Sequence, residues 1–140
     1  MNTVLSRYKR QCSNDYIDFQ VDVRSKTTTF IEDSDLTSLF CNLLDNSVEA
    51  AHGIQDAFIE LAVRKLENSP YIVITVLNSC RVNPFAEKNG VLATTKTDKL
   101  HHGFGLKSIH KIVSKYQGEF QQYFDDQTGT FHTIITLKCA

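Results

Sequence analysis

Four polar side chains between residues 42 and 49 are the first candidates for chemistry in this sequence. Asn42, Asp45, Asn46 and Glu49 fall on one narrow arc when residues 35–52 are placed on a helical wheel. Two mid-helix asparagines cost stability unless they bond something, and amide and carboxylate oxygens are hard ligands that suit Mg²⁺. A magnesium and phosphate site is one interpretation of this face. A solvated face with incidental asparagines is the other.

A second candidate is the segment His102–Leu106, which reads His-Gly-Phe-Gly-Leu. If a helix begins at Gly103, the glycines let the backbone approach an anion, and the free N–H groups attract negative charge. Thr94, Thr95 and Lys96 precede this segment and carry hydroxyl and ammonium groups that can contact phosphate oxygens. The alternatives are a plain loop-to-helix turn and a solvated loop.

The elements that must position these residues follow from periodicity and from turn residues. Two helices are expected, and five segments rich in β-branched and aromatic residues predict strands. The expected helices are Asp35–His52 and Gly103–Tyr116, and the expected strands are Tyr16–Arg24, Phe58–Leu66, Tyr71–Leu77, Glu119–Phe124 and Thr130–Lys138. The fold class predicted is an α/β two-layer sandwich, in which two or three helices cover one face of a mixed, largely antiparallel sheet of about five strands.

The ends of the first helix carry recognisable signals. Asp33, Ser34 and Asp35 offer N-cap chemistry, and Gly53 supplies a stop. Apolar residues fill most of the wheel outside the polar arc, which predicts a buried helix with a narrow polar face. Residues 78–102 form a long stretch without convincing periodicity, and such loops are usually functional or mobile.

Composition limits the classes of function. The chain has 140 residues, enough for one domain, with 41% hydrophobic and 22% charged residues. Fifteen Lys and Arg against sixteen Asp and Glu give a net charge of −1, which disfavours bulk binding to nucleic acid or anionic membrane. The four cysteines form no CxxC pair, and no apolar run approaches the roughly 18 residues of a membrane span. A charged ligand therefore requires a local site.

The order of these features resembles the GHKL superfamily of ATP-binding domains, which sensor histidine kinases, gyrase-type enzymes and mismatch-repair ATPases share. Residues 42–50 (Asn-Leu-Leu-Asp-Asn-Ser-Val-Glu-Ala) look like the N-box, Val76–Cys80 occupies the G1 position, and His102–Leu106 occupies the G2 position. The stretch Thr94–Ile109 is most similar to quorum-sensing receptor kinases of the Agr type. The resemblance covers about Asp15 to Leu137 and implies the Bergerat-type ATP-binding fold.

That resemblance implies roles for individual residues toward ATP and Mg²⁺. Asn46 would coordinate Mg²⁺, and Asn42 would contact the phosphates or the metal, so these two are the expected catalytic residues. Asn78 would bond the adenine. The remaining expected nucleotide contacts belong to the G2 segment and the loop before it: Thr95, Lys96, Gly103, Gly105 and Leu106.

Two departures from the superfamily pattern bear on the reaction. Most members place aspartate at G1, followed by a glycine turn, whereas this chain has Asn78, as the Agr-type branch characteristically does. Members that hydrolyse ATP use a glutamate four residues before the N-box asparagine, and Asn42 occupies that position. An amide cannot act as a general base near neutral pH, so the resemblance favours phosphoryl transfer over hydrolysis.

The resemblance also implies partners and a context. Residues 1–13 look like the tail of an upstream dimerisation helix and residues 14–140 like the catalytic domain. None of the five histidines lies on an upstream helix, so the phosphoacceptor is expected in the receptor's own dimerisation domain, without which the catalytic domain is expected to be inactive. A response regulator would act downstream, with no nucleic-acid partner. The chain would be a cytoplasmic domain, without direct membrane contact, of an integral membrane receptor.

Two other functions stay open from the sequence. One is a serine/threonine kinase of the anti-sigma type, which shares the fold and would need a protein substrate. The other is a module that keeps the fold and uses it for protein contacts without binding nucleotide.

Overall fold

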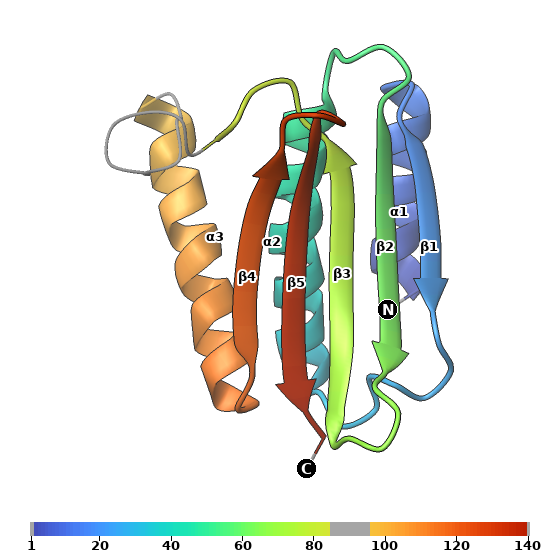
Figure 1. The fold of residues 1–140 in the computed structure, drawn as a ribbon, viewed down its shortest axis with the longest axis vertical. Coiled ribbons are helices and arrows are strands. Elements are labelled where there is room, and N and C mark those ends of the chain that lie inside the picture. Colours follow the sequence, from blue (N-terminus) through green and yellow to red (C-terminus); the bar gives the residue numbers. More distant parts are fainter. Residues whose placement is uncertain (1, 85–95, 140) are drawn as a thin grey trace.

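The computed structural model describes residues 2–84 and 96–139, which form three helices and five strands (Figure 1). In chain order these are α1 (Asn2–Asn14), β1 (Asp18–Val23), α2 (Asp33–Ala51), β2 (Phe58–Lys65), β3 (Tyr71–Ser79), α3 (Lys96–Lys115), β4 (Glu119–Asp125) and β5 (Thr130–Lys138). All five predicted strands are present.

The strands form one mixed sheet in the order β1-β2-β3-β5-β4. β1 and β2 are parallel, while the β2–β3, β3–β5 and β4–β5 pairs are antiparallel. A parallel pair needs a crossover connection, and α2 supplies it between β1 and β2. In Figure 1, α1 and α2 lie behind the strands, and α3 lies beside the β4 edge, where it contacts α2. The predicted two-layer α/β sandwich is therefore confirmed.

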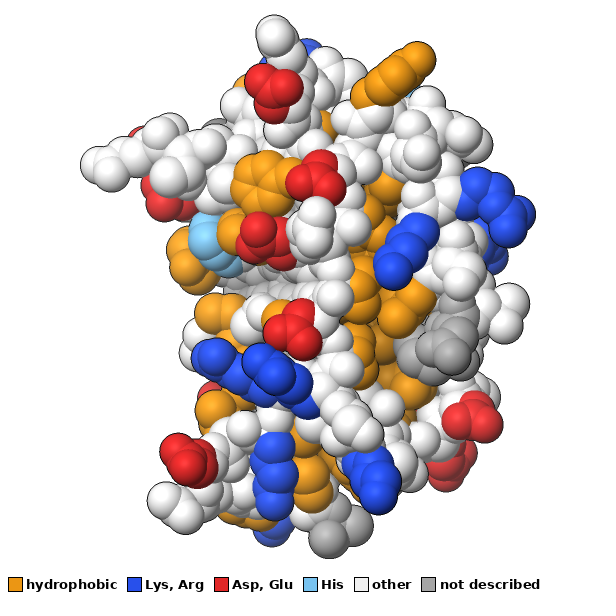
Figure 2. All heavy atoms as spheres, turned by 90° about the vertical axis from the view of Figure 1, so that its right-hand side faces the viewer, with side chains coloured by type: hydrophobic (Ala, Val, Ile, Leu, Met, Phe, Trp, Pro, Cys, Tyr) orange, Lys and Arg blue, Asp and Glu red, His pale blue; other side chains and the backbone are white. Residues whose placement is uncertain are grey.

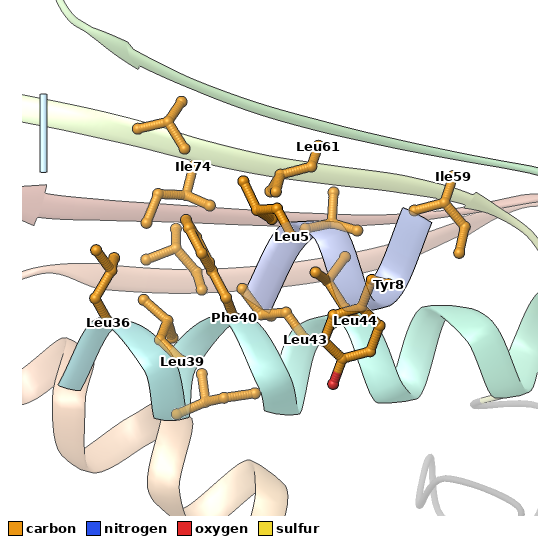
Figure 3. Close-up of a cluster of buried hydrophobic side chains, with 14 of the residues drawn as sticks. Leu5, Tyr8, Leu36, Leu39, Phe40, Leu43, Leu44, Ile59, Leu61 and Ile74 are labelled. Carbon is orange, nitrogen blue, oxygen red and sulfur yellow. The ribbon is translucent and has the colours of Figure 1, made fainter. Parts of the chain in front are cut away.

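The core lies between α2 and the covered face of the sheet. Leu36 and Phe40 point from α2 toward the strands in Figure 3, where Leu61 and Ile74 face them. Each fully buried side chain of this size contributes roughly 1.5–3 kcal/mol relative to leaving it exposed. The buried residues of α2 are Leu36, Leu39, Phe40, Leu43, Leu44, Ser47, Val48 and Ala51. The prediction of a largely buried helix is confirmed.

Helix α1 also packs into this core. Tyr8 is completely buried, Cys12 is 1% exposed, and Leu5 belongs to the same cluster (Figure 3). The Tyr8 hydroxyl donates a hydrogen bond to Asp45 Oδ1 of α2 at 2.5 Å. Residues 2–14 are thus joined to the rest of the fold by buried contacts. Their origin as the tail of an upstream dimerisation helix stays a prediction.

The start of α2 differs from the predicted N-cap. Glu32 occupies the cap position and makes no side-chain capping bond, so Asp33, Ser34 and Asp35 do not cap the helix. Asp35 instead accepts hydrogen bonds from Lys115 Nζ and Tyr116 Oη, both at 2.7 Å, which tie α2 to the end of α3. These bonds hold the pKa of the Asp35 carboxyl below its usual range. Gly53 has φ +79° just after the helix, as the predicted stop requires.

The start of α3 is also different. The helix begins at Lys96, seven residues before the predicted start, so Gly103 and Gly105 lie inside it. Residues 96–102 contain no proline or glycine, and an interior glycine costs a helix only about 1 kcal/mol relative to alanine. The expectation of a helix N-terminus at Gly103 is therefore wrong. The first free helical N–H groups belong to residues 96–99.

The β1 side of the molecule is an open sheet edge. Figure 2 faces this side and shows apolar side chains gathered in a band along it. Phe19, Val21 and Val23 of β1 and Val4 of α1 are partly buried hydrophobic residues packed against the core. Within residues 2–84 and 96–139, no helix combines the length and the apolar character that crossing a bilayer requires.

Candidate functional site

A cavity of about 240 Å³ opens between the C-terminal half of α2, the C-terminal end of β3 and the N-terminal end of β5. Its wall combines side chains from α2, from the end of β3 with the segment that follows, and from β4 and β5. The lining residues are Leu43, Asn46, Ser47, Glu49, Ala50, Asn78, Cys80, Arg81, Val82, Pro84, Gln122, Phe131 and Thr133. A mostly apolar wall with a few convergent polar groups is typical of a small-molecule site.

Two of the predicted site residues meet in this wall. Asn46 comes from α2 and Asn78 from β3, 32 positions later in the chain, and both line the cavity. The strand pairing places Asn78 opposite Ile59 on β2 and Phe131 on β5, so its side chain lies on the covered face of the sheet. The fold therefore brings the N-box and G1 asparagines to one cavity.

Asn78 is held by two hydrogen bonds at the base of the cavity. It is 2% exposed, and its Nδ2 donates to the backbone oxygen of Ser79 at 3.0 Å. Its Oδ1 accepts from the hydroxyl of Ser47, which is 3% exposed and lies at 3.1 Å. Ser47 was missed as a site residue because its partner is 31 positions away in sequence, and nothing local marks that pairing.

The cavity wall contains further residues that the sequence did not single out. Gln122 Nε2 donates to Thr133 Oγ1 at 3.2 Å on the strand side. On the α2 side, Arg81 Nη2 donates to the backbone oxygen of Gly53 at 3.0 Å, which places a guanidinium near the end of the helix. Arg81 directly follows the G1 segment Val76–Cys80 in the sequence, and this position was the signal that could have identified it as a site residue.

Cys80 also lines the cavity, directly after β3. Its thiol contacts the backbone oxygen of Val82 at 3.1 Å. Burial raises the pKa of this thiol, and the residue is 6% exposed. A buried thiol with a raised pKa is a poor nucleophile, so Cys80 shapes the wall of the cavity.

Asn42 occupies a different place from Asn46. It is half-buried on α2, and its Nδ2 donates to Ser38 Oγ at 3.4 Å. A side chain added at Gly105 would place its Cβ 3.3 Å from Asn42 Oδ1. The G2 glycine and the first N-box asparagine are therefore in close approach across the α2–α3 contact, although Asn42 is not among the described residues that line the cavity.

The other predicted contacts are placed only in part. Thr95 lies outside the described residues, as do the side chains of Lys96 and the rest of residues 96–104. Gly103 lies within α3, and Leu106 is a partly exposed residue on the same helix. Their roles toward phosphate stay predictions.

The residues present fit a magnesium ion that is shared with a phosphate. Asn46 lines the cavity, and its side chain carries an amide oxygen, which is a ligand type that Mg²⁺ accepts. In the described part of the chain, no group of three or more His, Cys, Asp or Glu could hold a metal by itself. Mg²⁺ normally keeps several waters and binds through one or two protein ligands together with substrate phosphates, and this donor set suits that mode.

Residues 31–137 match the model of the GHKL domain family. The chain belongs to this family. The matched range includes α2, β3 and α3, so the GHKL assignment covers the whole of the cavity wall. No curated protein matches the chain significantly.

Solved structures with the same fold include histidine kinases. The mycobacterial sensor histidine kinase MprB matches with a TM-score of 0.69 and 19% identity, over 98% of this chain and 91% of that one. The catalytic domain of histidine kinase ThkA matches with a TM-score of 0.71 and 17% identity, over 98% and 88%. Full-length ShkA, solved in complex with AMPPNP, matches with a TM-score of 0.71 and 16% identity, and this GHKL chain spans 29% of its length. At these identities the likeness establishes the fold.

Proposed function

We propose that this GHKL domain binds ATP with Mg²⁺ and presents the γ-phosphoryl group for transfer to a histidine of its own receptor. The observation that carries the proposal is the cavity in which the N-box residue Asn46 and the G1 residue Asn78 meet. The GHKL family match and the AMPPNP complex of ShkA, which shares the fold, support a nucleotide as the ligand.

The chemistry of the cavity suits a purine base. Leu43, Val82 and Phe131 offer apolar contact area for a ring. After its bonds to Ser47 and Ser79, the Asn78 amide has one N–H and one oxygen lone pair left for a ligand, counting the partners that the described residues supply. One donor beside one acceptor can pair with the edge of adenine.

Asn46 would hold Mg²⁺ together with the phosphates. Mg²⁺ held there would supply positive charge against the charge that develops on the phosphates during transfer. Asn42, whose side chain Gly105 of α3 approaches, would orient the phosphate end of the nucleotide. Because Asn42 cannot take a proton from water, this arrangement favours transfer to a positioned acceptor over hydrolysis.

The same proposal places the chain in a two-component receptor. We assign it to the Agr-type branch on Asn78 at G1 and on the sequence of residues 94–109. Its partners would be the receptor's dimerisation domain, which carries the acceptor histidine, and a response regulator. The domain would work on the cytoplasmic side of an integral membrane receptor.

Nucleotide-dependent stabilisation tests the proposal directly. A ligand that binds only the folded state stabilises it by RT ln(1 + [L]/Kd), which is about 2.7 kcal/mol at a concentration of 100 Kd. Titration with AMPPNP should raise the melting temperature with Mg²⁺ and much less with EDTA. The Gln121→Ala variant removes an exposed amide on β4 and should behave as the parent.

A flat melting temperature up to millimolar AMPPNP would contradict the proposal and favour a protein-binding module. The transfer step is tested on the longer receptor with γ-labelled ATP. Label on histidine is lost in acid, so an acid-stable product would instead indicate a serine/threonine kinase.

A further inference from the structure

We propose that Ser47 is a specificity-determining residue, which fixes the side-chain amide of Asn78 in one orientation and thereby makes the cavity prefer a 6-aminopurine to a 6-oxopurine. This inference rests on the proposed function, because it requires a purine base in the cavity. Ser47 lies within the N-box but is not one of the nucleotide contacts that the resemblance implies. The basis of the inference is the hydrogen bonding around Asn78.

The orientation of the Asn78 amide follows from its two neighbours. The backbone oxygen of Ser79, 3.0 Å from Nδ2, can only accept a hydrogen bond, so the NH₂ end of the amide must face it. That choice turns Oδ1 toward the hydroxyl of Ser47, at 3.1 Å. The reverse orientation would set Oδ1 against the Ser79 oxygen, with two acceptors facing each other.

The single proton of the Ser47 hydroxyl has two acceptors within reach. Leu43 O and Asn78 Oδ1 both lie 3.1 Å from Ser47 Oγ. Leu43 O is one turn earlier on α2, where the helical N–H of Ser47 already serves it. Asn78 Oδ1 is buried, and Ser47 is the donor that the described residues provide for it. The proton therefore serves Asn78 best, because an unsatisfied buried acceptor is costly.

A fixed amide distinguishes the two kinds of purine edge. Adenine presents the donor of its 6-amino group beside the acceptor N1, which matches the free lone pair of Oδ1 and the free N–H of Nδ2. A 6-oxopurine presents an acceptor at position 6 and an N–H at position 1, so it needs the amide reversed. Reversal breaks the contacts to Ser47 and to Ser79 O together. Sites that hydrogen-bond a ligand reject analogues that leave their buried groups unpaired.

The predicted consequence is a change in selectivity on removal of the Ser47 hydroxyl. In Ser47→Ala, the hydrogen bond to Ser79 O still orients the Asn78 amide, so part of the preference for ATP over ITP should remain. One hydrogen bond contributes a factor of about five at its usual strength. The ratio of affinities for ATP and ITP should therefore fall about fivefold. A purely structural loss would weaken both nucleotides alike and leave the ratio unchanged.

The test is calorimetric titration of the whole chain with non-hydrolysable analogues of ATP and ITP, each with Mg²⁺. The two bases differ at position 6 and in the proton on N1. Ser47→Ala and Ser47→Cys both remove the strong donor, and the cysteine keeps the side-chain volume if alanine fails to fold. Ser34→Ala, an exposed serine on the same helix, is the matched control and should keep the parent ratio.

Each result decides the matter. A parent that prefers the ATP analogue, with a ratio that narrows in the Ser47 variants alone, supports the inference. A parent that binds both analogues equally, or Ser47 variants that keep the parent ratio, overturn the inference while the proposed function stands. A parent that binds neither analogue overturns the proposed function, and the inference falls with it.

Discussion

Two polar clusters lie on different faces of α2 and use their hydrogen bonds in different ways. In the α1 seam, which consists of Arg7, Tyr8, Cys41 and Asp45, the Tyr8 hydroxyl donates to Asp45 Oδ1 at 2.5 Å, and Cys41 O lies 3.2 Å away. It also accepts from Arg7 Nη2 at 3.0 Å. These contacts of the buried phenol join α1 to α2.

Ser47 and Asn78, the cavity cluster, are almost as buried as Tyr8, but the hydrogen-bonding capacity of the Asn78 amide is not used up. Their mutual bond and the bond to Ser79 O satisfy half of the capacity of the Asn78 amide. Both residues border a cavity, which is where the remaining donor and acceptor can be used. A buried polar group whose partners are all internal holds a fold together, whereas one with capacity left beside a cavity is prepared for a ligand.

Removal of the seam tyrosine should give the largest effect, and it should be on stability. Tyr8 is fully buried in the core cluster, and truncation of a buried aromatic side chain to alanine costs about 3–5 kcal/mol. Tyr8→Ala should therefore lower the free energy of unfolding by about that amount in urea denaturation. Tyr8→Phe keeps the ring and removes the hydroxyl, so it should cost about 1–3 kcal/mol.

The two tyrosine variants check each other. An alanine variant as stable as the parent would mean that α1 is not part of the core. A phenylalanine variant that weakened AMPPNP binding as strongly as it weakened stability would mean that the seam also serves the ligand, and the contrast between the two clusters would fail.

Two adjacent residues of α2, one in each region, allow stability and nucleotide affinity to be compared in matched variants. Asp45 belongs to the seam, and Asn46 lines the cavity. Asn46→Ala should weaken AMPPNP binding in Mg²⁺ at least tenfold, about 1.4 kcal/mol, with the unfolding free energy changed by less than about 1 kcal/mol. Asp45→Asn should do the opposite, costing stability and leaving affinity within about twofold. Paired calorimetry and denaturation on the two variants measure this, and equal losses of affinity would show that the metal assignment to Asn46 is wrong.

The strands and the buried α2 could be predicted from the sequence, because periodicity encodes them locally. A shared site for Asn46 and Asn78 was implied only by the resemblance to GHKL domains, since 32 positions separate the two residues. The seam and the Ser47 bond could not be predicted. Asp45 falls on the same helical arc as Asn46, yet it turns to Tyr8, which is 37 positions away. The N-cap was mispredicted because Asp35 finds stronger partners in Lys115 and Tyr116, about 80 positions later. Local patterns identify a polar residue, and only the tertiary fold decides which partner it takes.

The seam should also respond to alkaline pH, which the cavity pair should not. Burial, and next the hydrogen bond to Asp45, raise the pKa of Tyr8 well above its ordinary value of about 10. Because the folded-state pKa is the higher one, this contribution to stability is complete below about pH 10 and is lost as the pH rises further. The loss has a slope of at most about 1.4 kcal/mol per pH unit. Tyr8→Phe should remove this slope from the unfolding free energy measured between about pH 9 and 11.

Tyr16→Phe is the control for the alkaline experiment, since Tyr16 is 90% exposed and lies outside the core cluster. The parent slope should persist in that variant. If the slope also persisted in Tyr8→Phe, another group would be responsible, and the pKa of Tyr116, which burial also raises, would be the next to test.

The smallest effect is expected at Gly105, where α3 approaches Asn42 of α2. Alanine favours the interior of a helix by about 1 kcal/mol over glycine, but the new Cβ would lie 3.3 Å from Asn42 Oδ1, so the asparagine must yield by a few tenths of an ångström. Gly105→Ala should therefore change the unfolding free energy by less than about 1 kcal/mol and weaken AMPPNP binding about two- to fivefold by displacing Asn42. Calorimetry at fixed Mg²⁺ separates these effects. Unchanged affinity would mean that the Gly105–Asn42 contact only packs α3 against α2, as the α1 seam packs α1 against α2. Asn42 would then not belong to the nucleotide site.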